Sequence, residues 1–180
     1  LDARRNNYLA AIYADSRSGR IGFAFADTTT GDFRLTEPAT PAELADELAR
    51  VQPSEVLVSD LQSADFRHVS GLVPRDGYVF LHDQAIFLLR DQFQVQSLDG
   101  FGCSDLPLAC SAAGAIVHYL RHELRRTLTH FTRLQVYRKT QFMILDAATQ
   151  ANLELVQARG GGRDTSLLSA LDRTVTPMGA

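Results

Sequence analysis

The sequence predicts an α/β domain with a mixed sheet flanked by helices, followed by a short all-α segment. Three observations support this prediction. The first forty residues hold three short apolar runs separated by turn-forming residues, as in an antiparallel meander. An amphipathic segment and another apolar run follow, which indicates a helical crossover to a parallel strand. Apolar residues then recur at helical spacing between residues 104 and 126.

Three N-terminal strands are predicted, at residues 7–14, 20–27 and 33–37. The first run is apolar and aromatic throughout, and the second alternates large apolar residues with small ones. The connections between them are rich in Asp, Ser, Thr and Gly, which form tight turns. Because the connections are short, the three strands are expected to pair antiparallel.

The first helix is predicted to begin after Thr40. Thr40 is a capping residue, Pro41 suits the first helical position, and Glu43 completes a capping box. One face of this helix carries the apolar residues Leu44, Leu48 and Val51. A buried strand at residues 55–59 follows and is expected to lie parallel to a neighbour, because a helix separates it from the meander.

The middle of the chain gives weaker signals. Residues 60–75 are expected to form a loop or irregular helix, and residues 78–81 a fifth strand. Asp83 is expected to cap a helix that ends near residue 93. Its inward-facing residues are expected to be Phe87, Leu88 and Phe93.

A long helix is predicted from a cap at Ser104 or Asp105 to about Arg126. Its apolar stripe consists of Ala109, Ala113, Ile116, Val117, Leu120 and Leu124. Residues 127–140 are mixed and β-branched, as in a linker with some strand. We therefore expect one domain at residues 1–130 and a second, all-α segment at residues 131–180. The order of elements in the first domain is that of an RNase H-like fold.

The composition limits the classes of function that the chain can have. Charged residues of both signs make up 22% of the 180 residues, the net charge is −3 and the pI is about 5.9. Most proteins whose whole surface grips nucleic acid are basic, so a primary DNA-binding role is not indicated. Cys103 and Cys110 fit no metal or redox spacing and are expected to be buried thiols. The chain shows no signal peptide or long apolar run and is expected to be cytoplasmic. Its start without Met and its short final segments suggest a piece of a larger protein.

An RNase H-like order raises the alternative of a metal-dependent nuclease. Such nucleases hold two Mg²⁺ ions with clustered carboxylates, one of them in the middle of the first strand. The middle of this strand is Leu9-Ala-Ala-Ile12, with no acid, and Asp15 lies beyond it in the turn. Asp27 and Asp32 flank the next turn and are expected to be turn formers.

Other candidate sites also have plainer interpretations. His118 and His122 lie four residues apart with Glu123 beside them, but they match neither order of a zinc-protease motif and are expected to face solvent. The glycines 160–162 lack the lysine of a phosphate-binding loop, and Asp164 or Thr165 is expected to cap a helix with Leu167, Leu168 and Leu171. Ser111, Ser166 and Ser169 have no nucleophile elbow around them.

Positive charge is concentrated in one part of the sequence, at Arg121, His122, Arg125, Arg126, Arg133, Arg138 and Lys139. This concentration is interpreted as a solvated helix end in preference to a contact with phosphates or an acidic partner.

Two C-terminal stretches are specific enough to indicate a family. They are Phe142-Met-Ile-Leu-Asp-Ala-Ala-Thr-Gln-Ala-Asn-Leu-Glu-Leu155 and Ser166-Leu-Leu-Ser-Ala-Leu-Asp-Arg-Thr-Val-Thr-Pro-Met-Gly179. They closely resemble the start of the core, or lever, domain of the MutS family of DNA mismatch repair ATPases. Earlier stretches resemble its connector domain more weakly: Asn7-Tyr-Leu-Ala-Ala-Ile12, Ala26-Asp-Thr-Thr-Thr-Gly-Asp-Phe-Arg-Leu-Thr-Glu37, Pro53-Ser-Glu-Val-Leu57, Gly100-Phe-Gly102 and Ala112-Ala-Gly-Ala115.

The resemblance implies a connector without nuclease activity, which agrees with the missing acid in the first strand. It implies a parent protein that is a homodimer, clamps mismatched DNA, binds ATP and Mg²⁺, and recruits MutL. The connector is implied to relay signals between the DNA-binding and ATPase parts and to contact MutL. The family's Phe-x-Glu mismatch reader and Walker A motif do not occur here. No catalytic, cofactor-binding or metal-binding residue is therefore carried onto this chain, which is expected to be no enzyme by itself and to bind mismatched DNA weakly or not at all.

Overall fold

The computed structural model describes residues 8–138, 147–155 and 166–171. The chain divides into two compact units, one of which is Asn7–Arg138. The other combines Leu1–Asn6 with Lys139–Ala180, and its described helices are α4 (Ala147–Asn152) and α5 (Leu167–Leu171). The expected helix with Leu167 and Leu171 is thus present. The predictions for residues 142–146, 160–162, Asp164 and Thr165 lie outside the described residues.

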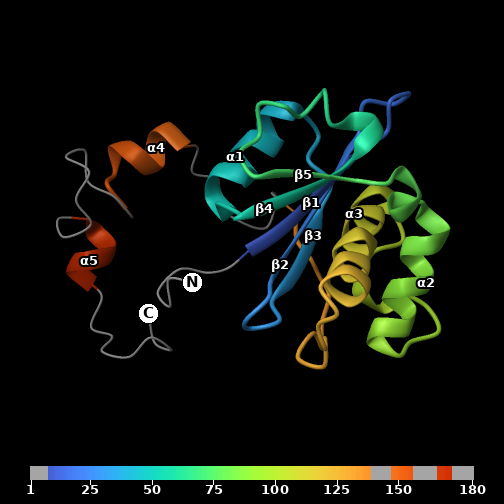
Figure 1. Ribbon diagram of the computed structural model, residues 1–180. Coiled ribbons are helices and arrows are strands. Elements are labelled where there is room, and N and C mark those ends of the chain that lie inside the picture. The colour runs from blue at the N-terminus through green and yellow to red at the C-terminus, as the bar shows by residue number, and fades with distance from the viewer. Residues whose placement is uncertain (1–7, 139–146, 156–165, 172–180) are drawn as a thin grey trace. The chain divides into compact units, whose positions relative to one another are not determined.

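A six-stranded mixed sheet forms the middle of the first unit (Figure 1). Its strands are β1 (Tyr8–Ala14), β2 (Ile21–Asp27), β3 (Phe33–Thr36), β4 (Glu55–Ser59), β5 (Leu72–Arg75) and β6 (Gln135–Val136). Their order across the sheet is β5-β4-β1-β2-β3-β6. β1, β2 and β3 pair antiparallel, whereas β4 lies parallel to β1 and β5 parallel to β4. The predicted α/β class with a mixed, RNase H-like sheet is confirmed.

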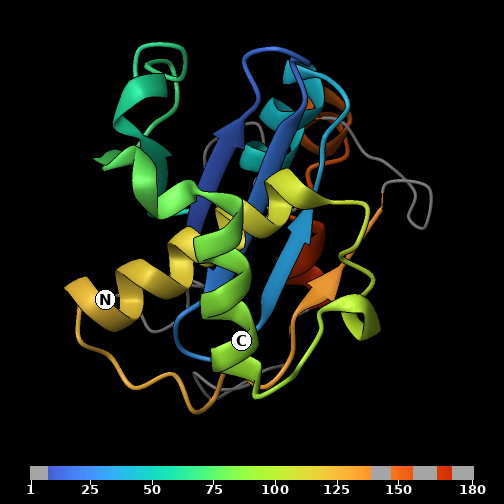
Figure 2. The same ribbon diagram turned by 90° about the vertical axis from the view of Figure 1, so that its right-hand side faces the viewer.

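Helices cover both faces of the sheet. Helix α1 (Pro41–Val51) lies on one face, and helices α2 (His82–Phe93) and α3 (Pro107–His118) lie on the other (Figure 2). Thr40 caps α1 as predicted, since its hydroxyl accepts from the Glu43 N–H at 3.2 Å. The Glu43 carboxylate accepts from the N–H of Ala39, one residue before the position that a capping box uses. Strand residues alternate between two buried cores, one under α1 and one under α2 and α3.

Small residues let α3 lie very close to the sheet. On β2 the side facing α3 carries Ala24 and Ala26, while Phe23 and Phe25 point to the α1 side. A Cβ on Gly22 would come within 2.1 Å of the Leu108 carbonyl carbon. The alternation of large and small residues in β2 therefore sets the two layers at different distances from the sheet.

Helix α3 differs from its prediction. Residues Ala109–Val117 are all buried, because α3 lies between the sheet and α2 and not at the surface. The helix ends at His118 and continues as a π-helical turn over Tyr119–Glu123, so it does not reach Arg126 as an α-helix. Leu124, predicted to be inward, is exposed.

The start of α3 is capped from elsewhere in the fold. Neither Ser104 nor Asp105 caps it. The Glu37 carboxylate instead accepts from the N–H groups of Leu108 and Ala109, at 2.8 and 3.2 Å. A capping partner 71 residues away cannot be read from local sequence.

Four further predictions in the middle of the chain were wrong. Residues 78–81 form no strand; Gly77–Phe80 is a 3₁₀ turn that leads into α2. The fifth strand is Leu72–Arg75, where Pro74 is tolerated because the strand lies at the sheet edge. Phe87 is exposed because α2 turns Ala85, Leu88 and Leu89 toward the interior, and Asp83 lies in the first turn of α2 without capping it.

Candidate functional site

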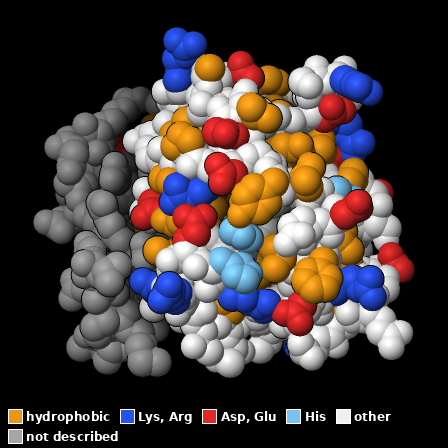
Figure 3. Space-filling model, turned by 45° about the vertical axis from the view of Figure 1, so that its right-hand side comes forward, with side chains coloured by type: hydrophobic (Ala, Val, Ile, Leu, Met, Phe, Trp, Pro, Cys, Tyr) orange, Lys and Arg blue, Asp and Glu red, His pale blue; other side chains and the backbone are white. Residues whose placement is uncertain are grey.

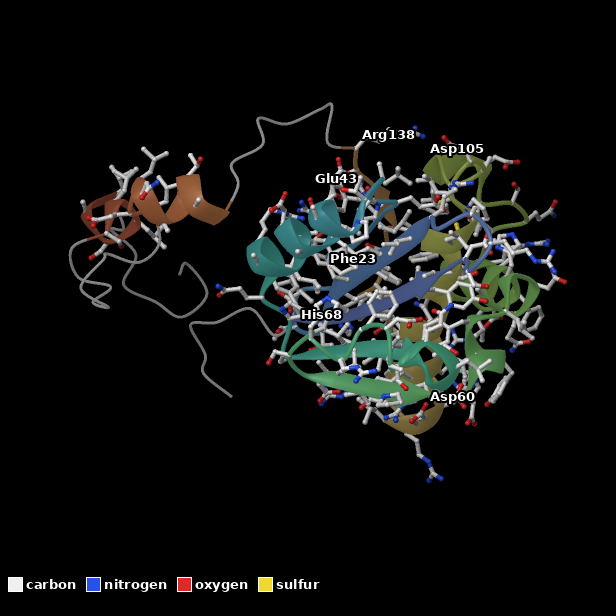
Figure 4. The ribbon with its side chains drawn as sticks, turned by 90° about the horizontal axis from the view of Figure 1, so that it is seen from above. Phe23, Glu43, Asp60, His68, Asp105 and Arg138 are labelled. Carbon is white, nitrogen blue, oxygen red and sulfur yellow. The ribbon has the colours of Figure 1, made fainter. Side chains whose placement is uncertain are left out.

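The parallel strands β1 and β4 end at the same edge of the sheet, where open α/β sheets commonly bind ligands. Asp15 follows β1 and Asp60 follows β4. The Asp15 carboxylate accepts from the Ser18 hydroxyl at 2.6 Å and from the Arg17 and Ser18 N–H groups. These hydrogen bonds lower the pKa of Asp15. The Asp60 carboxylate accepts from the Leu61 N–H at 2.9 Å, and its position is labelled in Figure 4. Both acids are therefore engaged in their own turns.

The acids of the second turn are also structural. The Asp27 carboxylate accepts from the Thr29 N–H at 2.8 Å and from the Thr30 N–H at 3.4 Å. Burial opposes ionisation of Asp27, but these hydrogen bonds outweigh it and lower its pKa. Asp32 pairs with Arg34 at 2.9 Å. Within residues 8–138, 147–155 and 166–171, no group of three or more His, Cys, Asp or Glu side chains is arranged to hold a metal ion.

His118 and His122 lie side by side, but only His122 faces solvent, whereas both were predicted to do so. Their ring centroids are 4.8 Å apart, and Figure 3 shows two adjoining His side chains among hydrophobic and charged ones. His122 is exposed, whereas the His118 side chain is only 13% exposed, because Tyr78 packs edge-on against it. Burial and the nearby charge of His122 lower the pKa of His118, and Glu123 offsets this only in part.

The basic cluster predicted from the sequence is not one surface. Arg121 donates to Asp91 and Gln92 at the end of α2. Arg138 donates two hydrogen bonds to Asp105, at 2.8 and 3.0 Å, just before α3 begins (Figure 4). The 12 residues of α3, roughly 18 Å in length, separate the two attachment points. Lys139 lies outside the described residues.

A cleft of about 720 Å³ opens beside α1. Its walls are α1 and residues 65–70, and its rim includes Asp15 and the turn after β1. Apolar side chains dominate the interior, namely Ile21, Leu44, Leu48, Phe66 and Val69. Its volume is in the range of small-molecule sites, and the Asp15 carboxylate at its rim is engaged by Arg17 and Ser18 of its own turn.

A polar cluster in which Glu47 and Tyr137 are buried and Arg50 reaches the surface anchors the end of the domain. The Tyr137 hydroxyl donates to the Glu47 carboxylate at 2.8 Å, and Arg50 binds the same carboxylate. The Arg50 guanidinium also lies over the rings of Tyr137 and Phe25, at 5.3 and 5.6 Å. Burial and the charge of Glu47 raise the pKa of Tyr137, so its hydroxyl stays protonated and donates.

This exit anchor, formed by Glu47, Arg50 and Tyr137, was missed by sequence reasoning. The Glu47 and Arg50 positions are three apart on α1 and form an ion pair, a signal present in the sequence. The partner Tyr137 lies 90 residues beyond Glu47, so only the fold brings it there. Together with the pairing of β6 to β3, the anchor keeps residues up to Arg138 in the first unit, beyond the boundary expected at residue 130.

Four large apolar side chains are exposed in the segments that precede and form α2. They are Leu61, Tyr78, Leu81 and Phe87, and we refer to them together as the α2 face. A side chain on Gly77 would meet Leu61 at 3.3 Å, so the Leu61 and Tyr78 segments adjoin. Hydrophobic side chains interspersed with acidic ones are visible on this side of the molecule (Figure 3).

Comparison with known proteins decides the family. The model of MutS domain II matches residues 7–132, which is most of the first unit. The chain belongs to the MutS domain II family. It is also 37% identical, over 189 aligned residues and all of its own length, to a DNA mismatch repair protein MutS from Desulfatibacillum aliphaticivorans. It spans about a fifth of the length of that relative (21%). The resemblance seen in the sequence is confirmed for MutS domain II.

Among the described residues, no helix of this domain II chain is long and apolar enough to cross a membrane.

Proposed function

We propose that this chain is the non-catalytic connector region of a mismatch repair MutS protein, and that it relays changes between the DNA-binding and ATPase parts. One observation carries the proposal: a MutS domain II chain builds an RNase H-like sheet whose first strand, Tyr8–Ala14, contains no acid. The acids nearest that strand, Asp15 and Asp60, are held in local turns. The nuclease alternative lacks a comparable supporting observation.

The exit anchor supports the relay. A connector transmits a displacement only if the chain leaving it is fixed to its body. Here the last residues of the domain are attached by the buried Tyr137 in the core under α1 and, more weakly, by the solvent-exposed ion pair of Arg138 with Asp105. A movement of α1 or of the turn before α3 is therefore expected to reach the chain at Lys139 and beyond.

The rest of the proposed activity belongs to other parts of the parent protein. ATP and Mg²⁺ are proposed to bind there, mismatched DNA is proposed to be held by the full-length homodimer, and this chain is proposed to contribute no site residue to either. The chain alone is expected to turn over no ATP. ATP hydrolysis by the purified chain above background would overturn this part of the proposal.

We further propose that MutL docks on the α2 face. Four large apolar side chains are exposed there, and exposed apolar patches mark interaction sites. The carboxylates of Asp76 and Asp83, both in the same segments, make no ion pair with any described residue. A partner surface that brings apolar and basic side chains would match both features.

The test is a binding measurement between MutL and the purified 180-residue chain. Phe87→Ser removes a large side chain that is 65% exposed and outside the core, so it should weaken binding at least tenfold without unfolding the chain. Leu171→Ser in α5, where the leucine is 70% exposed, is the matched control and should bind as the parent chain does. Equal binding by Phe87→Ser and the unmodified chain would refute docking at this face; no binding by any of them would favour a purely mechanical connector.

A further inference from the structure

The two cysteines of the domain lie against each other. Cys103 precedes α3 and Cys110 lies within it, and both are free thiols in the core under α2 and α3. The Cys110 thiol donates to the Cys103 carbonyl oxygen, with its Sγ 3.7 Å from that oxygen. Their spacing of seven residues matches no redox motif, so only the fold reveals the pair.

The two cysteines lie on different kinds of backbone, Cys110 in helix α3 and Cys103 in the turn before it. The Cys110 N–H donates to the Leu106 carbonyl in the first turns of α3. Cys103 stands outside the helix, after Gly102, whose φ of 73° is left-handed. A disulfide needs its sulfurs about 2.05 Å apart, so the thiols must approach further. Because Cys103 precedes the helix, we expect this approach to come from the turn that carries Cys103, whose carbonyl accepts from the Leu106 N–H at 3.0 Å.

The surroundings of the two thiols make them unequal. The neighbouring Cys110 side chain lowers the pKa of Cys103, although burial opposes the effect. The neighbouring Cys103 side chain raises the pKa of Cys110, and burial adds to that increase. Cys103 is therefore the better attacking thiolate and Cys110 the resolving thiol.

We propose that Cys103 and Cys110 form a reversible disulfide by exchange with a low-molecular-weight disulfide such as glutathione disulfide. The Cys103 thiolate attacks one sulfur of glutathione disulfide, and a first glutathione thiolate leaves and takes up a proton. Cys110 then loses its proton to solvent and attacks the Cys103 sulfur, which releases the second glutathione. The two protein thiols are oxidised by two electrons, and one glutathione disulfide is reduced to two glutathiones.

Access sets the rate of this reaction. Cys103 is 4% exposed and Cys110 is 1% exposed, so exchange must wait for local opening. The opening expected is that of residues 99–106, a 3₁₀ turn and loop in which Ser104 and Asp105 already face solvent. Asp105 also holds Arg138, so the same turn connects the thiol pair to the chain exit.

The test treats the folded, reduced chain with glutathione disulfide, blocks free thiols with iodoacetamide, and measures intact and peptide masses. We expect the unmodified chain to lose two hydrogens and to escape alkylation at both cysteines, with reversal by dithiothreitol. In Cys110→Ala, where the resolving thiol is missing, a glutathione adduct should persist on Cys103. Folding of the variant is checked by circular dichroism.

Three results would overturn the proposal. One is an unmodified chain that remains fully alkylated after treatment that oxidises the urea-unfolded chain. Another is a persistent glutathione adduct on the unmodified chain, because Cys110 would then not resolve it. The third is a disulfide between two chains, found as a covalent dimer in place of the internal bond. The proposal concerns this domain alone and does not depend on the proposed docking of MutL.

Discussion

The packing of α2 on α3 depends on a glycine. A Cβ added to Gly114 would lie 2.3 Å from the Ala85 Cβ and 2.4 Å from the Ala85 Cα. Carbon atoms in contact normally sit about 3.5–4.0 Å apart. Gly114→Ala therefore forces the two helices apart by roughly 1 Å or more. No side chain can rotate away, because one of the atoms met is backbone.

Two effects of this substitution oppose each other. Replacing Gly by Ala in a helix interior stabilises the helix by about 1 kcal/mol. Overpacking a core typically costs about 1–3 kcal/mol, and the upper end applies here because backbone must move. The clash outweighs the propensity, and we expect a net loss of about 2 kcal/mol in the free energy of unfolding.

Urea unfolding of the 180-residue chain, followed by circular dichroism, measures this loss. Gly100→Ala is the matched control, because a Cβ there meets nothing within 4 Å, and its stability should change by less than about 0.5 kcal/mol. An equal or higher stability of Gly114→Ala would mean that helix propensity prevails. The close approach of α2 to α3 would then be refuted.

Three further predictions concern buried polar groups. Tyr137→Phe removes a hydrogen bond to the buried Glu47 carboxylate and should cost about 2 kcal/mol in urea unfolding, whereas Tyr78→Phe at an exposed ring should cost almost nothing; equal effects would refute the exit anchor. Glu37→Ala removes the acceptor for two N–H groups of α3 and should lower the free energy of unfolding by about 1–2 kcal/mol, so an unchanged midpoint would argue against this cap. The pKa of His118 is lower in the folded chain than in the unfolded one, so its neutral form contributes stability that is present above the unfolded pKa of about 6.5 and is lost as pH falls from there through the lower pKa of the folded chain. His118→Gln should therefore flatten the decline in stability between about pH 7 and about pH 5, and an identical slope in the variant would exclude this role.

Local sequence was sufficient to predict the strands and helices that bury a single face. The strands β1, β2, β3 and β4 and the capped helix α1 were all predicted, because alternation and capping chemistry act within a few residues. Prediction failed at residues 72–81. The run Tyr78-Val-Phe has strong β propensity, yet the sheet edge is taken by Leu72–Arg75 and the chain must turn into α2. Competition for a place in the sheet is not encoded in either segment alone.

Side-chain partners were harder to predict than elements. Asp27 was correctly expected to form a turn, since its partners are two and three residues away. His118 was expected to face solvent on a one-sided helix, but α3 is covered on several sides and Tyr78 closes over it. The prediction that Phe87 faces inward was wrong because the close approach of Ala85 to Gly114 sets which side of α2 faces the interior.

The sequence by itself determined the α/β class, the order of its first strands, the absence of an acid in β1 and the resemblance to MutS. These depend on residue type and on spacing over a few positions. Only the tertiary structure decided which residues meet across long separations: Glu37 with the start of α3, Glu47 with Tyr137, and Cys103 with Cys110. The reason is physical, since these contacts form only after the sheet and helices have packed and brought distant segments within hydrogen-bonding distance.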